Sequence, residues 1–469
     1  MTPAIDHPAS FRDPSGFVYR RDGVLLRQIE PVYAEDWRAL VASGLMTRLQ
    51  DAGKLVRHEE ADLALAARPG AVAVLRPEVI DTISHPFEWA FSQLKDAALL
   101  TLDVAEQALG AGMVLKDASA YNVAFHQGRP VFLDTLSFER RVEGSPWVAY
   151  RQFCQHFLAP LALMSRVDIR LSQLLRVHVD GVPLDLASAL LPTSSWFTPG
   201  LLMHVHLHAR SQRKHASDAA APAAPTAPAA PAAPTSFSPQ AFLGLLESLR
   251  GAITGLDWNP VGTEWADYYQ RNNNYGSDGL EHKAAVLGAM LDRVKPATVW
   301  DLGGNTGRFS RVASARGARV VTWDVDPACV EAHWREVRRA GETTVLPLLL
   351  DLTNPSSGMG WAGEERDGLA GRGPVDCVMA LGLVHHLAIS NNVPLGRVGR
   401  YLAQLGRTVI LEFVPKEDSQ VVKLLATRKD VFPDYHRAGL EAAFAPYLAL
   451  EEAVDIPGMT RTLYRFRAL

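Results

Sequence analysis

The chain has 469 residues, which is enough for two or three domains that each bury a sizeable core. Hydrophobic residues make up 48% and charged residues 21%, close to average globular usage, which excludes a wholly disordered or fibrous chain. Lysine and arginine number 47 against 51 aspartate and glutamate. The formal net charge of -4 therefore provides no positive field for nucleic acid or an anionic membrane, and we expect neither as a partner.

Cysteine usage and the N-terminal segment indicate a reducing compartment. The three cysteines, Cys154, Cys329 and Cys377, include no pair spaced as a metal knuckle or a redox CxxC motif. The segment MTPAIDHPASFRDPSG lacks the basic start and apolar core of a signal peptide. No apolar run approaches the roughly 18 residues that a membrane span needs. We expect a soluble, cytoplasmic protein without a metal site.

One motif stands out in the first part of the chain, residues 1–217. Asp117 and Asn122 have the spacing D-x-x-x-x-N, and Asp134 follows a predicted hairpin formed by Val123–Phe125 and Pro130–Leu133. Over Leu99–Phe138 this arrangement resembles the protein-kinase-like fold. The resemblance implies that Asp117 and Asn122 belong to a catalytic loop and that Asp134 is a magnesium-binding aspartate.

The same segment departs from kinases in three ways. Leu115 stands where the usual histidine would be, Thr135-Leu136 replaces the Phe-Gly pair, and no glycine-rich phosphate loop appears in the first 90 residues. Three interpretations stay open: an active phosphotransferase, a kinase-like domain used for binding or regulation, and a chance match. We expect residues 1–217 to form a mainly helical α+β domain with a possible kinase-like core.

Histidines alternate in the segment MHVHLHAR, at His204, His206 and His208. Alternate histidines can bind metal, but on a helix only His204 and His208 share a face, and no acid follows in the HExxH manner. We therefore expect a structural role for them.

A proline repeat divides the chain at residues 218–236. Prolines recur there at every third position, which excludes helix and favours an extended polyproline II spacer. The prediction is a passive tether between domain 1–217 and domain 237–469. The repeating prolines are Pro222, Pro225, Pro228, Pro231 and Pro234.

A strand, a glycine-rich turn and a helix follow one another in the last part of the chain. The strand Val299–Asp301 runs into LGGNTG, and helical spacing resumes at Phe309–Ala315. Glycines at 303, 304 and 307 let backbone N–H groups approach a ligand closely, and Asn305 tolerates a positive φ. A second strand, Ala318–Trp323, ends in Asp324, where a carboxylate can accept the two hydroxyls of a ribose.

Further strands alternate with helices, which predicts a mostly parallel sheet with a ligand crevice at the carboxyl ends of its strands. Asp351 ends the third strand, the fourth runs into His385-His386, Glu412 lies near the end of the fifth, and the last two strands form a closing pair. These strands are Val345–Leu350, Val375–Leu381, Thr408–Val414, Tyr447–Ala453 and Thr460–Phe466.

The segments DLGGNTG, WDVDP, LLLDL and DCVMALGLVHHL resemble those of class I S-adenosylmethionine-dependent methyltransferases, over nearly all of residues 237–469. The resemblance implies a Rossmann-like seven-stranded sheet and S-adenosyl-L-methionine as cofactor. Asn305 replaces the middle glycine of the family. A dinucleotide oxidoreductase is the alternative, but its GxGxxG usually lacks the leading acid. The residues implied for the cofactor are Asp301, Gly303, Gly304, Asn305 and Gly307 at the methionine part, Asp324 at the ribose, and Asp351 and Leu352 at the adenine edge.

Methyl transfer requires an aligned acceptor and, where the acceptor carries a proton, a nearby base. His385 and His386 are the first candidates, with a packed or capping histidine as the alternative. Glu412 is another candidate base, unless it pairs with Lys416 or a helix N-terminus.

Four aromatic residues upstream of the glycine turn could cap the pocket and face a positively charged sulfonium, or could instead pack outside the sheet. They are Trp265, Tyr268, Tyr269 and Tyr275.

The whole layout resembles a bacterial group that is labelled class I methyltransferase or nodulation protein. It implies a transferase whose acceptor is a small molecule, with a protein acceptor as a second option. Two alternatives remain: a non-catalytic cofactor-binding scaffold or regulatory protein, and a bifunctional protein with an N-terminal phosphotransferase-like domain.

Overall fold

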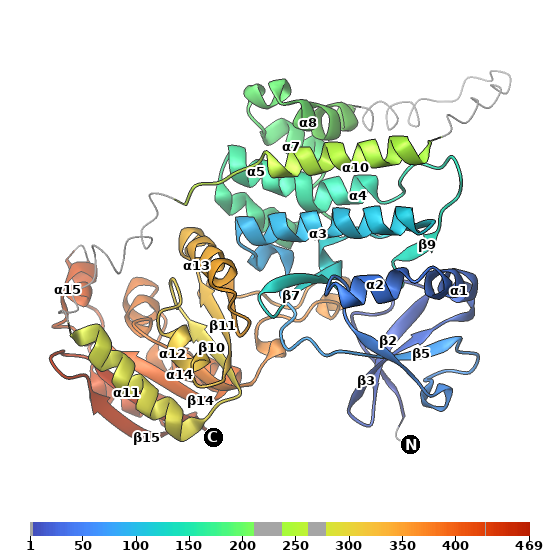
Figure 1. Ribbon diagram of the computed structural model, residues 1–469. Helices are drawn as coiled ribbons and strands as arrows, with labels where there is room; N and C mark the ends of the chain where they lie inside the picture. Colours follow the sequence, from blue (N-terminus) through green and yellow to red (C-terminus); the bar gives the residue numbers. More distant parts are fainter. Residues whose placement is uncertain (1–2, 211–236, 261–277, 427) are drawn as a thin grey trace. The chain divides into compact units, whose positions relative to one another are not determined.

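The computed structural model describes residues 3–210, 237–260, 278–426 and 428–469 (Figure 1). The chain divides into two compact units, the first made of residues 1–126 and 130–259 and the second of residues 127–129 and 260–469. The predicted linker at 218–236 and the aromatic residues Trp265, Tyr268, Tyr269 and Tyr275 lie outside the described residues. Within these described ranges, no helix is both long and apolar enough to cross a membrane.

The first unit begins with a five-stranded antiparallel sheet in the order β1-β2-β3-β5-β4. Its core face carries Phe17 and Tyr19 from β2, Leu26 from β3 and Val74 from β5. The short helices α1 and α2 connect β3 to β4. The five strands are β1 (Ile5–Asp6), β2 (Gly16–Arg21), β3 (Val24–Ile29), β4 (His58–Ala61) and β5 (Ala73–Pro77), and the helices are α1 (Ala34–Ala42) and α2 (Leu45–Asp51).

A mainly helical part follows, built around the 20-residue helix α3, whose spacing of apolar residues was predictable from the sequence. The predicted hairpin forms as β7 and β8, and Gln127 and Gly128 at its turn both have positive φ. The remaining elements, with short 3-10 and π segments between them, are α3 (Phe91–Gly110), β6 (Met113–Leu115), β7 (Val123–His126), β8 (Arg129–Phe132), β9 (Phe138–Arg140), α4 (Tyr150–Phe153), α5 (Ala159–Arg166), α6 (Leu174–Val177), α7 (Leu184–Leu190), α8 (Pro199–Leu201) and α10 (Pro239–Thr254).

The position of helix α10 differs from the prediction. The predicted second domain began at residue 237, but α10 belongs to the first unit. It packs against α3 (Figure 1), and its buried stripe is Phe242, Leu246, Leu249 and Ile253. The Arg250 guanidinium on α10 also donates to the Glu106 carboxylate on α3 at 2.6 Å. The two units therefore divide after residue 259 rather than at the proline repeat.

The histidines of MHVHLHAR support the structural interpretation. His204 is fully buried, and its two ring nitrogens lie 2.8 Å from the Tyr150 hydroxyl and 2.8 Å from the Ser248 hydroxyl. His206 is held in the same way by Ser188 and Ser195. In the part of the chain that the structure describes, no cluster of three or more His, Cys, Asp or Glu side chains could hold a metal ion.

The second unit contains the predicted Rossmann-like sheet of seven strands, in the order β12-β11-β10-β13-β14-β16-β15. The first five strands are parallel, and β16 runs antiparallel between β14 and β15, which confirms the predicted closing pair. The elements are α11 (Gly279–Val294), β10 (Thr298–Leu302), α12 (Ser310–Ser314), β11 (Arg319–Asp324), α13 (Pro327–Ala340), β12 (Val345–Leu349), β13 (Val375–Ala380), α14 (Leu395–Leu405), β14 (Gly406–Phe413), α15 (Ser419–Leu425), α16 (Arg437–Phe444), β15 (Leu448–Asp455) and β16 (Thr462–Ala468).

Apolar side chains fix α11 and α12 on one face of this sheet. Leu287 and Leu291 of α11 share a buried cluster with Val299 of β10, Met379 of β13 and Ile410 of β14. The strand order reverses at β10, because β11 lies on one side of it and β13 on the other. In open α/β sheets a ligand crevice forms outside the carboxyl ends of the strands at such a reversal.

Candidate active site

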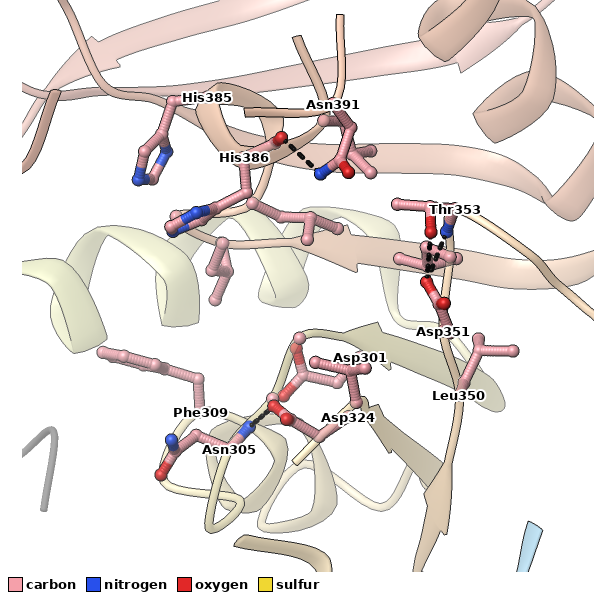
Figure 2. Close-up of a pocket in the computed structure, with 18 of the residues that line it drawn as sticks. Asp301, Asn305, Phe309, Asp324, Leu350, Asp351, Thr353, His385, His386 and Asn391 are labelled. Atoms are coloured by element: carbon pink, nitrogen blue, oxygen red, sulfur yellow. Dashed lines mark hydrogen bonds between the residues drawn. The ribbon is translucent and has the colours of Figure 1, made fainter. Parts of the chain in front are cut away.

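A cavity of about 370 Å³ lies at this reversal, at the carboxyl ends of β10, β11, β12 and β13. The residues that follow these four strands line it: 303–304 after β10, Val325 after β11, 350–353 after β12 and 381–383 after β13. Figure 2 shows His385 and His386 on one side of the cavity, with Asp301, Asp324 and Asn305 across from them. The volume falls within the range of small-molecule sites.

Asp301 lies at the base of the glycine loop, 1% exposed near the end of β10. Its Oδ2 accepts a hydrogen bond from the Ser310 hydroxyl at 2.6 Å. Burial raises the pKa of this carboxyl to about 6, despite the Ser310 bond and the nearby Lys283 ammonium. A side chain at position 304 would meet Asp301 and Thr322, with a Cβ 2.4 Å from Thr322 Cγ2, so Gly304 lets the loop close over the acid.

Asn305 and Asp324 connect the loop to β11. Asn305 has a φ of 52°, as its place in the motif predicted, and its backbone N–H donates to Asp324 Oδ2 at 2.8 Å. The backbone N–H of Asp326 donates to Asp324 Oδ1 at 2.9 Å. Burial outweighs these two bonds and raises the pKa of Asp324 to about 6. Its carboxylate is thereby fixed at the cavity wall, in a position to accept two adjacent hydroxyls.

Asp351 and Leu352 line the cavity directly after β12. The Asp351 carboxylate is exposed, and its Oδ1 accepts bonds from the Thr353 backbone N–H at 2.8 Å and the Thr353 hydroxyl at 2.6 Å. These two bonds order the turn at this end of the cavity (Figure 2).

The two histidines lie against each other, with ring centroids 4.1 Å apart. His385 is 4% exposed, and its buried Nδ1 has no hydrogen-bond partner in the described part of the chain. Burial, His386 and the cations Arg461 and Lys283 hold the pKa of His385 well below its usual value. Burial also lowers the pKa of His386. Both rings are therefore neutral near pH 7 and can accept a proton or a hydrogen bond.

Glu412 is fully buried and does not line the cavity. Its Oε2 accepts from the Lys283 ammonium at 2.7 Å, and its Oε1 lies 3.5 Å from Arg461 Nη1. Burial raises the pKa of Glu412, but Lys283 and Arg461 outweigh it and hold the pKa below its usual value. The alternative partner Lys416 binds Asp430 instead.

The structure thus brings nine of the eleven predicted site residues to one cavity and leaves Gly307 and Glu412 outside its lining. Sequence reasoning missed Lys283, Phe309, Asn391 and Gln420, which also line it. Phe309 and Gln420 open short helices and carry no motif. Lys283 lies on α11, 18 residues before Asp301, and looks in the sequence like any surface lysine of an amphipathic helix.

Gly307 supports the loop from behind. Its φ is +79°, and a Cβ there would lie 2.0 Å from His333 Cε1, on a ring that is fully buried. We expect Gly307→Ala to destabilise the second unit by about 2–4 kcal/mol, from left-handed strain and overpacking. Gly317→Ala is the matched control, because its φ is +89° and no atom lies within 4 Å of the added Cβ. Calorimetric melting should show a clearly smaller loss for the control; equal losses would contradict the steric argument.

The residues of the kinase-like motif lie together in the first unit, but Asp134, the aspartate that would bind magnesium in a kinase, already has protein partners. Asp117 and Asn122 share a side-chain hydrogen bond. Asp134 Oδ1 accepts from Arg27 Nη2 of β3 at 2.5 Å, and its Oδ2 accepts from the Ser137 hydroxyl. Burial raises the pKa of Asp134, but Arg27 and Ser137 outweigh it and lower the pKa below its usual value. Arg27 thus neutralises the carboxylate that would bind magnesium in a kinase.

The strand order, the glycine loop after β10 and the acids at the ends of β10, β11 and β12 define the second unit as a Rossmann-like α/β fold of the class I methyltransferase type. The whole chain is 37% identical to the nodulation protein NoeA of Rhizobium meliloti (strain 1021) over 463 residues, 97% of this chain and 95% of that protein. The chain belongs to the family of NoeA. No protein-family model matches it.

Three solved structures that match the chain each cover less than half of it. The N-methyltransferase NodS from Bradyrhizobium japonicum WM9 is 12% identical, with a TM-score of 0.31, 41% of this chain and 97% of NodS covered. The magnesium protoporphyrin IX methyltransferase of Synechocystis PCC 6803 with bound SAH is 18% identical, with a TM-score of 0.30, 41% of this chain and 84% of that chain covered. The bifunctional kinase-methyltransferase WbdD is 15% identical, with a TM-score of 0.30 and coverages of 45% and 43%. Such scores say nothing about activity.

Proposed function

We propose that the protein is a methyltransferase that binds S-adenosylmethionine in the second unit and methylates a small-molecule acceptor. The observation that carries the proposal is the convergence of the glycine loop with three acid-bearing strand ends on one cavity at the sheet reversal. When bound, the cofactor supplies a methyl group on a positively charged sulfonium. The near-neutral chain and the small cavity, of about 370 Å³, favour a small acceptor over nucleic acid.

The residues present fit this cofactor. Asp324 is fixed by two backbone bonds so that its carboxylate can accept both ribose hydroxyls. Asp351 and Leu352 offer an edge for the adenine at one end of the cavity. The Gly304 loop, which a Cβ would block, brings the backbone close to the methionine part, while its N–H groups at 303–307 donate within the protein.

On the acceptor side, the neutral rings of His385 and His386 face the cavity across from the acids (Figure 2). Either can hold the acceptor and take its proton as the methyl group is transferred. We assign the proton transfer to His385, because its Nδ1 has no hydrogen-bond partner among the described residues and can accept a proton. Glu412 acts as a positioning residue, because its two oxygens are occupied by Lys283 and Arg461.

Titration calorimetry of the full chain with S-adenosylmethionine and S-adenosylhomocysteine tests the cofactor. We expect both to bind, and Asp301→Ala to weaken binding by about 100-fold through loss of a buried charged anchor. Asp376→Ala is the control, because Asp376 accepts from Thr298 at the opposite end of the strands. No binding by the wild-type chain would overturn the proposal.

His385→Phe separates an enzyme from a non-catalytic scaffold. In the enzyme, this variant keeps its cofactor affinity but loses the transfer of labelled methyl groups into a small-molecule extract of the source cells. Cofactor binding without any transfer by the wild-type chain would favour the scaffold.

We also propose that the protein is cytoplasmic. This is supported by Cys154, Cys329 and Cys377, which are all buried and not paired with one another.

A further inference from the structure

A buried cation lies in the cavity wall, and no motif accounts for it. Lys283 on α11 is 2% exposed, and its Nζ lies 4.3 Å from the centroid of the Phe309 ring. Among the described residues that line the cavity, it is the one lysine or arginine. Burying an ammonium costs several kcal/mol unless paired, so its presence at a ligand site requires a reason.

Lys283 is the first member of a chain of alternating buried charges. Its ammonium donates to Glu412 Oε2 at 2.7 Å, and Glu412 Oε1 lies 3.5 Å from Arg461 Nη1. Arg461 in turn donates from Nε and Nη2 to the two oxygens of Asp418, at 2.8 and 3.2 Å. All four side chains are at most 3% exposed. Of these four side chains, only Lys283 reaches the cavity, so this series of buried charges ends in a positive group at the cavity wall.

The position of Lys283 along the cavity indicates what it faces. It interacts electrostatically with Asp301, which lies under the glycine loop. The ring of Phe309, which the ammonium contacts, lies beside Asn305 of the same loop (Figure 2). Asp351 and Thr353 lie elsewhere in the lining, after β12. Lys283 therefore belongs to the loop end of the cavity.

Resting on the proposed function, we propose that the Lys283 ammonium binds the carboxylate of the cofactor's amino-acid part, and that Glu412, Arg461 and Asp418 hold the ammonium in place. At this end the cavity offers the acid Asp301 and the ammonium Lys283, opposite in charge to the ammonium and carboxylate of a free amino acid. Two charged groups of opposite sign fix the orientation of such a zwitterion better than either alone.

Two ligands that differ in this carboxylate test the proposal on the full chain. Decarboxylated S-adenosylmethionine keeps the sulfonium and the amine of S-adenosylmethionine but lacks its carboxylate. We expect the wild-type chain to bind S-adenosylmethionine about 10- to 100-fold more tightly than the decarboxylated form in calorimetric titrations. In Lys283→Met this preference should fall to about 3-fold or less, because only the carboxylate loses its partner.

The control is Arg293→Met, which removes a cation of the same helix whose partner, Glu452, belongs to β15. It should keep the wild-type preference. If Lys283→Met does not fold, Lys283→Met with Glu412→Gln removes both charges of the pair, and the same loss of preference is expected.

A wild-type chain without preference, or a variant that keeps the full preference, would overturn the proposal while leaving the cofactor assignment intact. An equal loss of affinity for both ligands would also overturn it, because that is the result of a structural role for Lys283. Failure of the wild-type chain to bind either ligand would overturn the proposed function, and this inference with it.

Discussion

Replacing Arg461 with methionine is expected to lower the melting temperature of the second unit by about 10 °C or more. Arg461 is 1% exposed and is the counter-ion of both Asp418 and Glu412. Its removal takes the cation away from two buried carboxylates, which typically costs about 3–5 kcal/mol. For a unit of this size each kcal/mol shifts the melting temperature by about 2–4 °C.

Scanning calorimetry of the full chain measures this effect as a shift of the second unit's transition alone. Arg339→Met is the matched control, because Arg339 pairs with Glu336 on the exposed surface of α13, where an ion pair contributes about 1 kcal/mol or less. The deficit of Arg461→Met should shrink as the pH falls, because the pKa of Glu412 is held low by Lys283 and Arg461 and rises once Arg461 is gone. A shift in melting temperature as small as that of the control would show that the buried ion pairs of Arg461 contribute no net stability.

The cavity was largely predictable because its signals are local in sequence. Asp301, Asp324 and Asp351 each end an apolar strand, and parallel strands bring their carboxyl ends to one edge of the sheet. The positive φ of Asn305 follows from the tight turn in which it stands. The alternation of strands and helices in the sequence was therefore sufficient to predict that these three carboxylates lie close together.

The buried charge chain could not be predicted, because its members come from distant parts of the sequence. Lys283 precedes Glu412 by 129 positions, and Arg461 follows it by 49. Each of these three side chains resembles an ordinary solvated charge, and the near neighbour Lys416 is the more obvious partner for Glu412. Only the packing of α11 and the turn before β16 against the end of β14 makes them ion pairs.

The sequence-based assignment of α10 to the second domain was wrong for a related reason. Its stripe of Phe242, Leu246, Leu249 and Ile253 predicts a buried face, but not the surface that covers it. The proline repeat suggested a boundary, whereas the apolar surface of α3 decides which unit the helix joins. The antiparallel sheet before residue 80 went unrecognised because its strands are short and weakly alternating.

Replacing Asp324 with asparagine is expected to weaken S-adenosylhomocysteine binding by about 100-fold at neutral pH and to change its pH dependence. An ionised carboxylate accepts two hydroxyls through charge-assisted bonds, whereas the amide that replaces it offers one neutral oxygen. The pKa of Asp324 is raised to about 6 by burial, so binding in the wild-type chain should be constant above about pH 7 and weaken as the pH falls through 6.

The sign of the accompanying stability change separates binding from folding. A carboxyl whose pKa is higher in the folded chain than in the unfolded chain makes the folded state relatively more stable as the pH falls toward about 4. Protonation of Asp324 therefore weakens ligand binding without unfolding the protein. Circular dichroism at each pH checks that the chain remains folded.

The slope of log affinity against pH completes the test. Asp301, with its pKa also raised to about 6, can contribute a second proton, so the wild-type slope below pH 6 should lie between one and two. In Asp324→Asn the slope should decrease by one, and any part that belongs to Asp301 or to the ligand stays. An unchanged slope would mean that Asp324 does not bind the ligand in its ionised form, and the ribose would then need another partner among the residues of the cavity.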